Sequence, residues 1–262
     1  MKISILISSF NKGRYLEKCI KSCLNQTYKN YEIILLDNYS NDNTDLILKK
    51  YNKFIIIKKE LKISSYSAVN QMDILKKAFS ISTGEIICLL DADDYFEDNK
   101  LDKIYRSFSK NDKIKIIFDK PIILINNKFD NFIIKKKFSK NIWPTTYPTS
   151  SINIKKDLLK IFFENKTFGS YPLLEIDFRI TTLSKMIYKN FLIIDERLTI
   201  YRKVSDGIMS KNKKFSNNWW IKRLSAHHFI RDIYKKTEII YKKNYDFYLT
   251  KTIVYLLNQI IK

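Results

Sequence analysis

Glycine, proline, cysteine and histidine are scarce in this chain, with four, four, three and two residues among 262. The sequence has no Gly-x-Gly-x-x-Gly motif and no Gly-Lys-Ser/Thr loop, which argues against a dinucleotide-binding dehydrogenase and a P-loop nucleoside triphosphatase. Three cysteines cannot build a disulfide framework, and no His or Cys spacing resembles a zinc site. A reducing cytoplasm is therefore the expected compartment.

Long apolar segments are also missing. The apolar run after Met1 and Lys2 is too short for a signal sequence, and no segment approaches the about 20 apolar residues of a membrane span. The run from Thr252 to Ile261 could form a helix at a membrane interface, but an ordinary packed helix is the stronger interpretation. We expect a cytoplasmic protein that is soluble or peripheral at the inner face of the membrane.

Positive charge is abundant, since 48 Lys+Arg stand against 27 Asp+Glu and give a net charge of +21. Such a charge raises nucleic acid, an anionic membrane surface and phosphorylated substrates as partners. The basic residues are spread along the chain, and abundant Lys, Ile and Asn with little Gly or Pro is typical of base-composition pressure on the gene. We therefore do not expect a nucleic-acid partner, and the sequence does not indicate an oligomeric state.

The hydrophobic pattern of the first half alternates between strands and helices. Strands are predicted over residues 3–7, 33–36, 54–57 and 86–90. One helix is predicted to end near residue 25, and two more are predicted over 45–51 and 68–79. This alternation predicts right-handed crossovers and an α/β fold with a mixed, mainly parallel sheet flanked by helices. Because ligands bind beyond the carboxyl ends of parallel strands, the loops 8–11, 37–44 and 91–94 should gather at one edge of the sheet.

The second half is less regular. We expect a helix near 99–109, short strands near 114–118 and 122–125, a loop over 143–150, a helix over 174–188, a strand at 191–194 and a helical tail from residue 219. We place a soft boundary near residue 110 and expect the two halves to share one core.

Three carboxylates follow the fourth predicted strand, in the sequence Asp91-Ala92-Asp93-Asp94. Asp91 and Asp93 point the same way, because side chains i and i+2 of a strand share a face. Hard cations such as Mg²⁺ and Mn²⁺ prefer carboxylate oxygens and often keep positions for substrate phosphates. Taken alone, however, an acidic cluster after a strand is more often a solvated turn or a helix start.

Several segments together carry a recognisable pattern. They are residues 3–11 (ISILISSFN), 24–33 (LNQTYKNYEI), 36–44 (LDNYSNDNT), 83–94 (TGEIICLLDADD), 148–156 (PTSSINIKK), 174–177 (LEID) and 198–202 (LTIYR). In this order they resemble the family-two glycosyltransferases, whose nucleotide-sugar-binding fold is called GT-A. The resemblance spans roughly residues 1–210 and is most specific over the first half.

The resemblance implies a Rossmann-like GT-A domain. Residues 1–110 would form its nucleotide-sugar-binding half, residues 111–210 its acceptor-binding and catalytic half, and residues 211–262 a helical extension. A divalent cation, Mn²⁺ or Mg²⁺, would be held chiefly by Asp93, with Asp91 supporting it or binding the ribose. The residues implied to contact the nucleotide sugar are Ser8, Ser9, Phe10, Asn11, Asp37, Asn38, Asp91 and Ala92.

The resemblance also indicates the catalytic acid. Glu175 aligns with the second acid of the family's Glu-Asp pair, and Leu174 occupies the place of the first. In an inverting enzyme this carboxylate removes a proton from the acceptor hydroxyl. Asp177 is the second candidate base, because two residues' separation on a helix would turn it away from Glu175. Without the other motifs, a solvated or capping acid near a helix start would be the preferred interpretation of both.

The chain departs from the family pattern at two places. Asn38 stands where many members carry an acid that contacts uracil, so both UDP- and dTDP-sugars stay open. Val204 stands where many relatives place a His that completes the metal shell. His227 and His228 lie outside the motifs, and we interpret them as structural or solvated. Trp143, Trp219 and Trp220 could stack on sugar rings. We interpret them as core residues, because large aromatic side chains more often serve that role.

The leading hypothesis is a metal-dependent inverting glycosyltransferase. It would move a sugar from a UDP- or dTDP-sugar to a glycan or lipid-linked acceptor in cell-surface polysaccharide or lipid-linked oligosaccharide synthesis. A retaining sugar transferase or a nucleotidyltransferase is the alternative enzyme, although residues 8–13 (SSFNKG) are a poor phosphate loop. Outside enzymes, the alternative is a basic module that binds nucleic acid or an anionic membrane.

Overall fold

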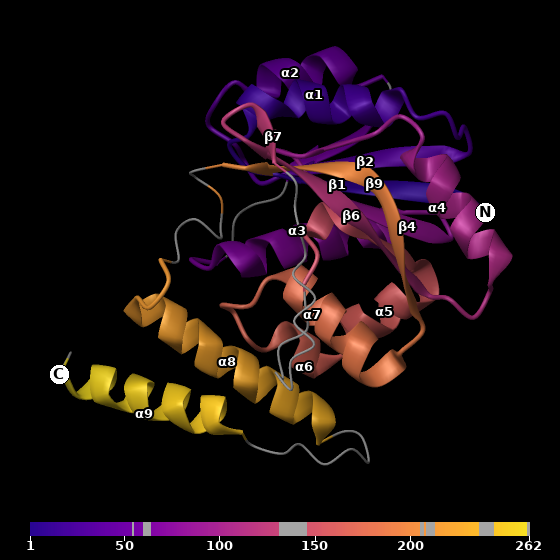
Figure 1. The fold of residues 1–262 in the computed structure, drawn as a ribbon. Coiled ribbons are helices and arrows are strands. Elements are labelled where there is room, and N and C mark those ends of the chain that lie inside the picture. Colours follow the sequence, from indigo (N-terminus) through magenta and orange to yellow (C-terminus); the bar gives the residue numbers. More distant parts are fainter. Residues whose placement is uncertain are drawn as a thin grey trace.

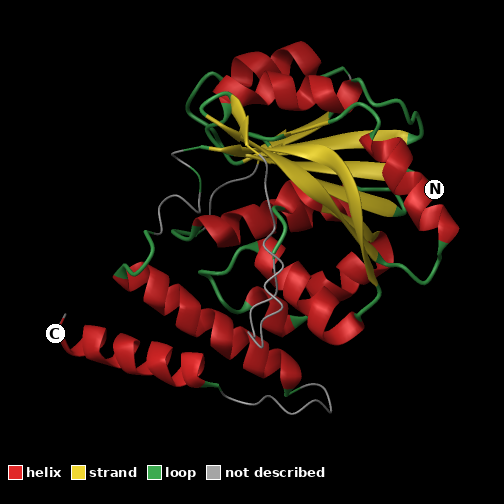
Figure 2. Ribbon diagram, in the orientation of Figure 1, coloured by secondary structure: helices red, strands yellow, loops and turns green. Residues whose placement is uncertain are grey.

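A computed structural model describes residues 1–53, 55–59, 64–130, 146–204, 207, 213–235 and 244–260. One curved sheet lies between two layers of helices, and the last described helix lies outside the lower layer (Figure 1). Figure 2 shows the same division between strands and helices.

The sheet has the strand order β3-β2-β1-β4-β8-β6-β9-β5, and β7 pairs with β6. Its strands are β1 Ile3–Ser9, β2 Tyr31–Asp37, β3 Ile56–Lys59, β4 Ile86–Asp91, β5 Tyr95–Phe96, β6 Ile116–Ile125, β7 Lys128–Asp130, β8 Ile152–Lys155 and β9 Phe191–Lys203. The first four strands are parallel to one another, and β8 runs antiparallel between β4 and β6. The sheet is therefore mixed, as the alternation of elements predicts.

One face of the sheet is covered by α1 Gly13–Leu24, α2 Thr44–Tyr51 and α4 Lys100–Lys110. Alternate side chains of a strand share a face, so Ile3, Ile5 and Ile7 all pack into this layer. Cys19 and Cys23 of α1 are buried free thiols in the same cluster. Apolar packing, rather than any thiol chemistry, accounts for these two cysteines.

The opposite face is covered by α3 Ser67–Ile81, α5 Lys156–Glu164, α6 Lys166–Gly169, α7 Ile176–Leu183 and α8 Asn217–Tyr234. Leu6 of β1 joins this layer together with Leu75, Phe162, Ile180 and Phe229 from the helices. Two short turns complete it, the 3₁₀ turn η1 Thr149–Ser151 and the π turn η2 Ser184–Tyr188. The last described helix, α9 Tyr245–Ile260, packs on α8.

The second half is more regular than its hydrophobic pattern indicates. The two strands predicted near 114–118 and 122–125 form one strand, β6, whose register with β9 shifts between Asp119 and Pro121. Proline donates no ladder hydrogen bond, so Pro121 divides one strand into two apparent ones.

Strand β9 also runs on to Lys203, past the predicted end at residue 194. The helix predicted from residue 174 begins at Ile176, because Glu175 before it is extended. Part of the predicted loop 143–150 lies outside the described residues.

The sheet continues across the predicted boundary near residue 110, because β4 pairs with β8 and β5 pairs with β9. The described residues on both sides of that boundary thus share one sheet. The division into a donor-binding half, a catalytic half and a helical extension stays a prediction. Within the described ranges, every helix is too short or too polar to cross a membrane.

Candidate functional site

The loops after β1, β2 and β4 meet at the carboxyl edge of the sheet, as predicted. Asn11 joins the first two: its backbone N–H donates to Ser40 Oγ at 2.7 Å, and its Oδ1 accepts from the N–H of Asn41 at 2.9 Å. Asn11 has a φ of 51°, a conformation that asparagine tolerates better than most residues. Ser8 Oγ donates to Asp91 Oδ1 at 3.1 Å and so joins the third loop to the first.

Asp37 closes the loop after β2. Its buried carboxylate accepts from the backbone N–H and the hydroxyl of Ser40, at 2.8 and 2.6 Å. The next residue, Asn38, is also buried, and its N–H donates to the carbonyl of Ser9 at 2.9 Å. Phe10 is instead exposed. The buried residues fix the shape of the loop, and Phe10 presents an aromatic side chain at its surface.

Asp91, at the end of β4, is held from two sides. Besides the Ser8 hydroxyl, its Oδ1 accepts from Nε2 of Gln71 on α3 at 2.6 Å. Burial raises the pKa of the Asp91 carboxyl to about 6, and the charge of Asp93 adds to the rise, whereas both hydrogen bonds lower it. Gln71 carries no signal in the sequence, because a single glutamine on a helix matches no motif.

Asp93 faces Lys12, whose Nζ lies 3.1 Å from Asp93 Oδ2. Between the two acids Ala92 is buried, and its N–H donates to the carbonyl of Ser8 at 3.1 Å. The segment is thus anchored through its backbone, which leaves the Asp93 carboxylate to interact with cations. Lys12 is a further residue that sequence patterns did not indicate.

The donor set after β4 suits a divalent cation. Asp91 and Asp93 supply hard carboxylate oxygens, and the pKa of Asp91 is raised chiefly by burial and further by the charge of Asp93. Within the described ranges, no three His, Cys, Asp or Glu side chains are grouped to hold a metal. The protein would therefore supply few ligands, and diphosphate oxygens and water would take the remaining positions.

Both histidines contact residues of α9. His227 of α8 is buried, and its Nε2 lies 2.9 Å from Oδ2 of Asp246 on α9. Burial lowers the pKa of both His227 and His228. His227 is therefore structural, in line with its interpretation from sequence.

Asp94 is fully enclosed and anchors the acidic segment to the second half of the chain. Ser150 Oγ donates to Asp94 Oδ2 at 2.6 Å, and the backbone N–H of Arg202 donates to Asp94 Oδ1 at 2.7 Å. Ser150 Oγ also accepts from the N–H of Asp91 at 3.0 Å. Burial raises the pKa of Asp94, and the charges of Asp93 and Asp91 add to the rise. One serine thus bridges two acids of the segment.

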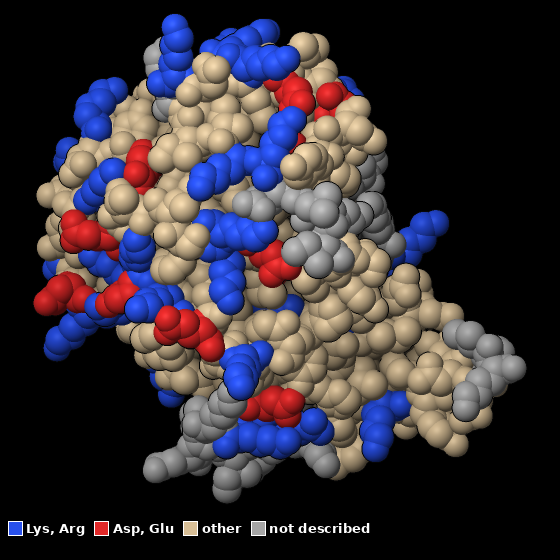
Figure 3. Space-filling view, turned by 180° about the vertical axis from the view of Figure 1, so that it is seen from behind, with Lys and Arg blue, Asp and Glu red and all other residues tan. Residues whose placement is uncertain are grey.

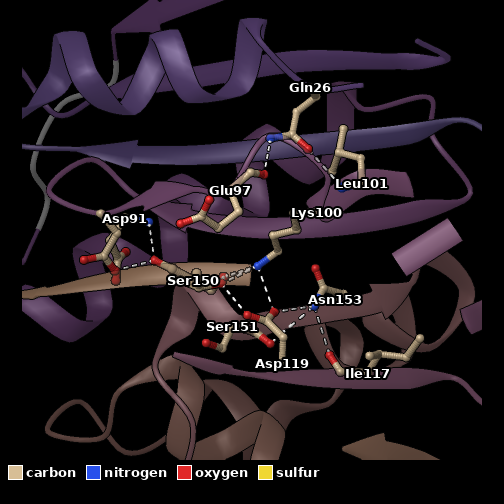
Figure 4. A network of polar contacts seen from close by, with 12 residues as sticks. Gln26, Asp91, Glu97, Lys100, Leu101, Ile117, Asp119, Ser150, Ser151 and Asn153 are labelled. Carbon is tan, nitrogen blue, oxygen red and sulfur yellow. Dashed lines mark hydrogen bonds and ion pairs between the residues drawn. The ribbon is translucent and has the colours of Figure 1, made fainter. Parts of the chain in front are cut away.

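Ser150 is itself held by a buried ion pair (Figure 4). Lys100 Nζ lies 2.8 Å from both Asp119 Oδ1 and the carbonyl of Ser150, and both charged side chains are fully buried. Thr199 donates to Asp119 Oδ2 at 2.6 Å, and Asn153 Nδ2 donates to Oδ1 at 3.1 Å. The network links α4, β6, η1, β8 and β9 behind the acidic segment.

Glu175 is the N-cap residue of α7, with extended backbone at φ −71° and ψ 157°, and it is buried. Its Oε1 forms an ion pair with Nζ of Lys222 on α8. Lys222 lies beyond the segments that carry the family pattern, so the sequence did not indicate it.

Asp177 lies in the first turn of α7 and is partly buried. Burial raises its pKa to about 7, the charges of Glu175 and Asp91 add to the rise, and the charge of Lys222 opposes it. The helical spacing behind the expectation that Asp177 turns away from Glu175 does not apply, because Glu175 precedes the helix and is not helical. The two acids act on each other, and Asp177 also interacts with the acidic segment after β4.

Tyr201 of β9 is influenced by the charges of acids after β4 and on α7. Burial raises the pKa of its phenol, and the charges of Asp94, Asp91, Asp177 and Asp93 all add to the rise. Tyr201 was indicated only as part of the segment 198–202, without a role. Acids from both groups thus raise the pKa of the same phenol.

Trp219 and Trp220 lie in the first turn of α8. Their ring centroids are 4.7 Å apart, and Phe215 lies 5.3 Å from Trp219. Both tryptophans are only partly buried, so their interpretation as core residues is wrong. The reason is that this turn of α8 lies at the surface. Trp143 lies outside the described residues.

Comparisons with known sequences place these residues in a family context. The model of glycosyl transferase family 2 matches residues 4–156. An uncharacterized glycosyltransferase of Methanocaldococcus jannaschii is 30% identical over 229 residues, which are 81% of this chain and 74% of that protein. Two other curated relatives match along only 39% and 38% of their own length.

Solved structures share the fold. TarS 1-349 of S. aureus in complex with UDP-GlcNAc superposes with a TM-score of 0.67 and 14% identity, over 97% of this chain and 70% of that one. Mannosyltransferase PcManGT from Pyrobaculum calidifontis, in complex with GDP-Man and Mn²⁺, gives 0.57 and 13%, over 97% and 69%. The predicted GT-A type of sheet is confirmed.

Proposed function

Because this chain belongs to glycosyl transferase family 2, we propose that it is a glycosyltransferase that moves a sugar from a nucleotide-diphosphate donor to a glycan hydroxyl. One observation carries the proposal: the loops after β1, β2 and β4 meet beside Asp91 and Asp93, joined by the hydrogen bonds from Ser8 to Asp91 and from Asn11 to Ser40. Asp91 and Asp93 suit a cation with a diphosphate. The α7 pair, Glu175 and Asp177, suits proton removal.

The donor would lie across the carboxyl edge of the sheet. We assign its contacts to the residues from Ser8 to Asn11, to Asp37 and Asn38, and to Asp91 and Ala92. The fold shared with proteins crystallised with UDP-GlcNAc and GDP-Man supports a nucleotide-sugar donor. A UDP- or dTDP-sugar is proposed, because the amide of Asn38 can both donate and accept hydrogen bonds toward a pyrimidine.

Asp93 is the proposed main ligand of Mn²⁺ or Mg²⁺, with Asp91 as the second. The cation, when bound, supplies positive charge that stabilises the leaving diphosphate. Lys12, 3.1 Å from Asp93, adds a fixed positive charge beside the same oxygens. Gln71 and Ser8 orient Asp91 through their hydrogen bonds to its Oδ1.

Glu175 is the proposed base of an inverting transfer. The acceptor oxygen attacks the anomeric carbon, and its proton passes to the Glu175 carboxylate. The bond between the anomeric carbon and the phosphate oxygen breaks, and the nucleoside diphosphate leaves with the electron pair. Lys222 holds Glu175 in place, and Asp177, with a pKa near 7, is the second candidate.

The three predicted parts of the chain keep their proposed roles. Residues 1–110 would bind the donor, residues 111–210 would bind the acceptor and hold the base, and residues 211–262 would form a helical extension. The Lys222 ion pair supports a direct contribution of the extension to catalysis. We propose a cytoplasmic enzyme, peripheral at the inner face of the membrane, that acts on a polysaccharide or a lipid-linked oligosaccharide.

Incubation with Mn²⁺ and a panel of UDP-, dTDP- and GDP-sugars tests this function. We expect hydrolysis or transfer of at least one donor and a higher Tm with the matching nucleoside diphosphate. Neither response with any donor would rule out the proposal. NMR of the product reports the anomeric configuration, and retention would overturn the inverting mechanism.

A further inference from the structure

The outward face of α9 is uncharged along its length. Large apolar side chains are exposed there at helical spacing, and polar Thr and Gln complete the stripe: Tyr245, Tyr248, Leu249, Thr252, Tyr255, Leu256 and Gln259. In a chain whose residues are 29% charged, a surface stripe of this length without a charge is unusual. Scattered exposed apolar residues need no explanation, but a contiguous patch indicates a binding surface.

The inward face of α9 explains how the helix is attached. Phe247 and Val254 are buried. The one described acid of the helix, Asp246, also turns inward, where its Oδ1 lies 2.5 Å from Arg223 and its Oδ2 lies 2.9 Å from His227. The outward stripe therefore carries no negative charge. The inward face alone attaches α9 to α8.

Exposed basic residues are present on both helices. Lys251 is exposed on α9, and Lys235 is exposed at the end of α8. Residues 211–262 contain twelve Lys+Arg and only three Asp+Glu. Figure 3 shows charged side chains crowded over the layers around the sheet and few over the end of the molecule formed by α8 and α9. The apolar stripe thus lies within a basic part of the chain.

We propose that α9 lies flat on an anionic lipid bilayer, with its outward stripe at the level of the headgroups. Tyrosine suits this depth because its ring is apolar and its hydroxyl is polar, and leucine reaches the acyl chains. A helix of 16 residues is about 24 Å long, enough to lie on a membrane and too short to span it.

The positive charge around α9 favours a membrane over a second copy of the chain as the partner of the outward stripe. Two copies packed on this face would bring two basic segments together, whereas an anionic surface complements them. The inference deepens the peripheral association proposed above by naming the surface that makes it, and its test needs no catalytic activity.

Co-sedimentation with vesicles tests this surface. The protein should bind vesicles of phosphatidylcholine mixed with phosphatidylglycerol, bind phosphatidylcholine alone much less, and lose binding as salt is added. The double substitution Tyr255→Ser and Leu256→Ser should lower the ratio of bound to free protein by about tenfold or more, since it removes apolar area from the interface.

Leu46→Ser is the matched control, because Leu46 on α2 is as exposed as Leu256, at 64% against 54%. It should bind vesicles like the unaltered protein. Equal binding by the double variant, or no binding by the unaltered protein, would overturn the proposal. A dimer in light scattering that the double variant disrupts, without vesicle binding, would assign the stripe to a second copy. None of these assays uses a sugar donor, so their outcome is independent of the donor panel.

Discussion

Lys222 of α8 forms an ion pair with Glu175, the N-cap residue that precedes α7, and the two side chains are only 17% and 10% exposed. Removal of one partner of a largely buried pair is costly, because it leaves a charge without compensation. A residue of α8 thus supports the proposed catalytic base.

Glu175→Gln should lower the rate of transfer by about 10²- to 10⁴-fold, because an amide cannot accept the acceptor's proton. Donor binding should persist, since Glu175 is not among the proposed donor contacts. Initial rates together with the Tm shift caused by the nucleoside diphosphate measure both effects. Asp177→Asn is the comparison variant. If Glu175→Gln transfers normally and Asp177→Asn does not, Asp177 is the base.

Lys222→Gln should move the acidic limb of the kcat/KM profile to higher pH. The charge of Lys222 lowers the pKa of Asp177, so its removal lets that pKa rise above about 7 and keeps Asp177 protonated over a wider pH range. Lys235→Gln makes the same change at the exposed end of α8, where the side chain is 65% exposed, and should leave the profile unaltered. An unshifted acidic limb in Lys222→Gln would contradict the proposed electrostatic effect of Lys222 on Asp177.

Asp93→Ala should remove the stimulation of transfer by Mn²⁺ and slow the reaction by roughly 10²- to 10³-fold, the range expected when a main electrostatic stabiliser is lost. A titration of the rate with Mn²⁺ measures this. Asp45→Ala, which breaks only the surface pair with Lys59, is the control and should respond to Mn²⁺ normally. A normal Mn²⁺ response in Asp93→Ala would remove Asp93 from the metal site.

Asp177→Asn should stabilise the protein increasingly as the pH rises from about 4 to about 7. The folded pKa of Asp177 is raised to about 7 from 3.8, so in this window the folded state holds a proton that the unfolded state has lost, and the free energy of unfolding falls with pH. The variant lacks this titration. Its Tm advantage without metal should be small at pH 4 and level off above pH 7. A Tm difference between Asp177→Asn and the unaltered protein that does not grow from pH 4 to pH 7 would contradict the raised pKa of Asp177.

Lys100→Met should destabilise the fold by about 3 kcal/mol or more, because Asp119 then keeps a buried charge without its cation. The double variant Lys100→Met with Asp119→Asn should recover part of that loss. An Asn side chain can still accept the hydrogen bond from Thr199, and it carries no charge. Urea denaturation measures both. A double variant less stable than the single one would show that the pair is not coupled.

The sequence predicts the loops of the site better than the residues behind them. Asp91, Asp93 and Asn11 follow strands, and strand ends meet at one edge, so local patterns suffice to bring them together. Gln71 and Ser150 reach the acids from elements that share no local pattern with them. Lys222 comes from still further along the chain. Such residues become visible only when the packing of helices on the sheet is known.

The position of β8 has a consequence for the order in which this chain folds. Strand β4 is covered on one side by β1, close in sequence, and on the other by β8, which begins only at Ile152. During synthesis β4 keeps an open edge while some 60 further residues are added, and an open strand edge is a template for pairing with other chains. A ribosome-bound fragment that ends near residue 110 should therefore depend on chaperones far more than one that extends past Lys155.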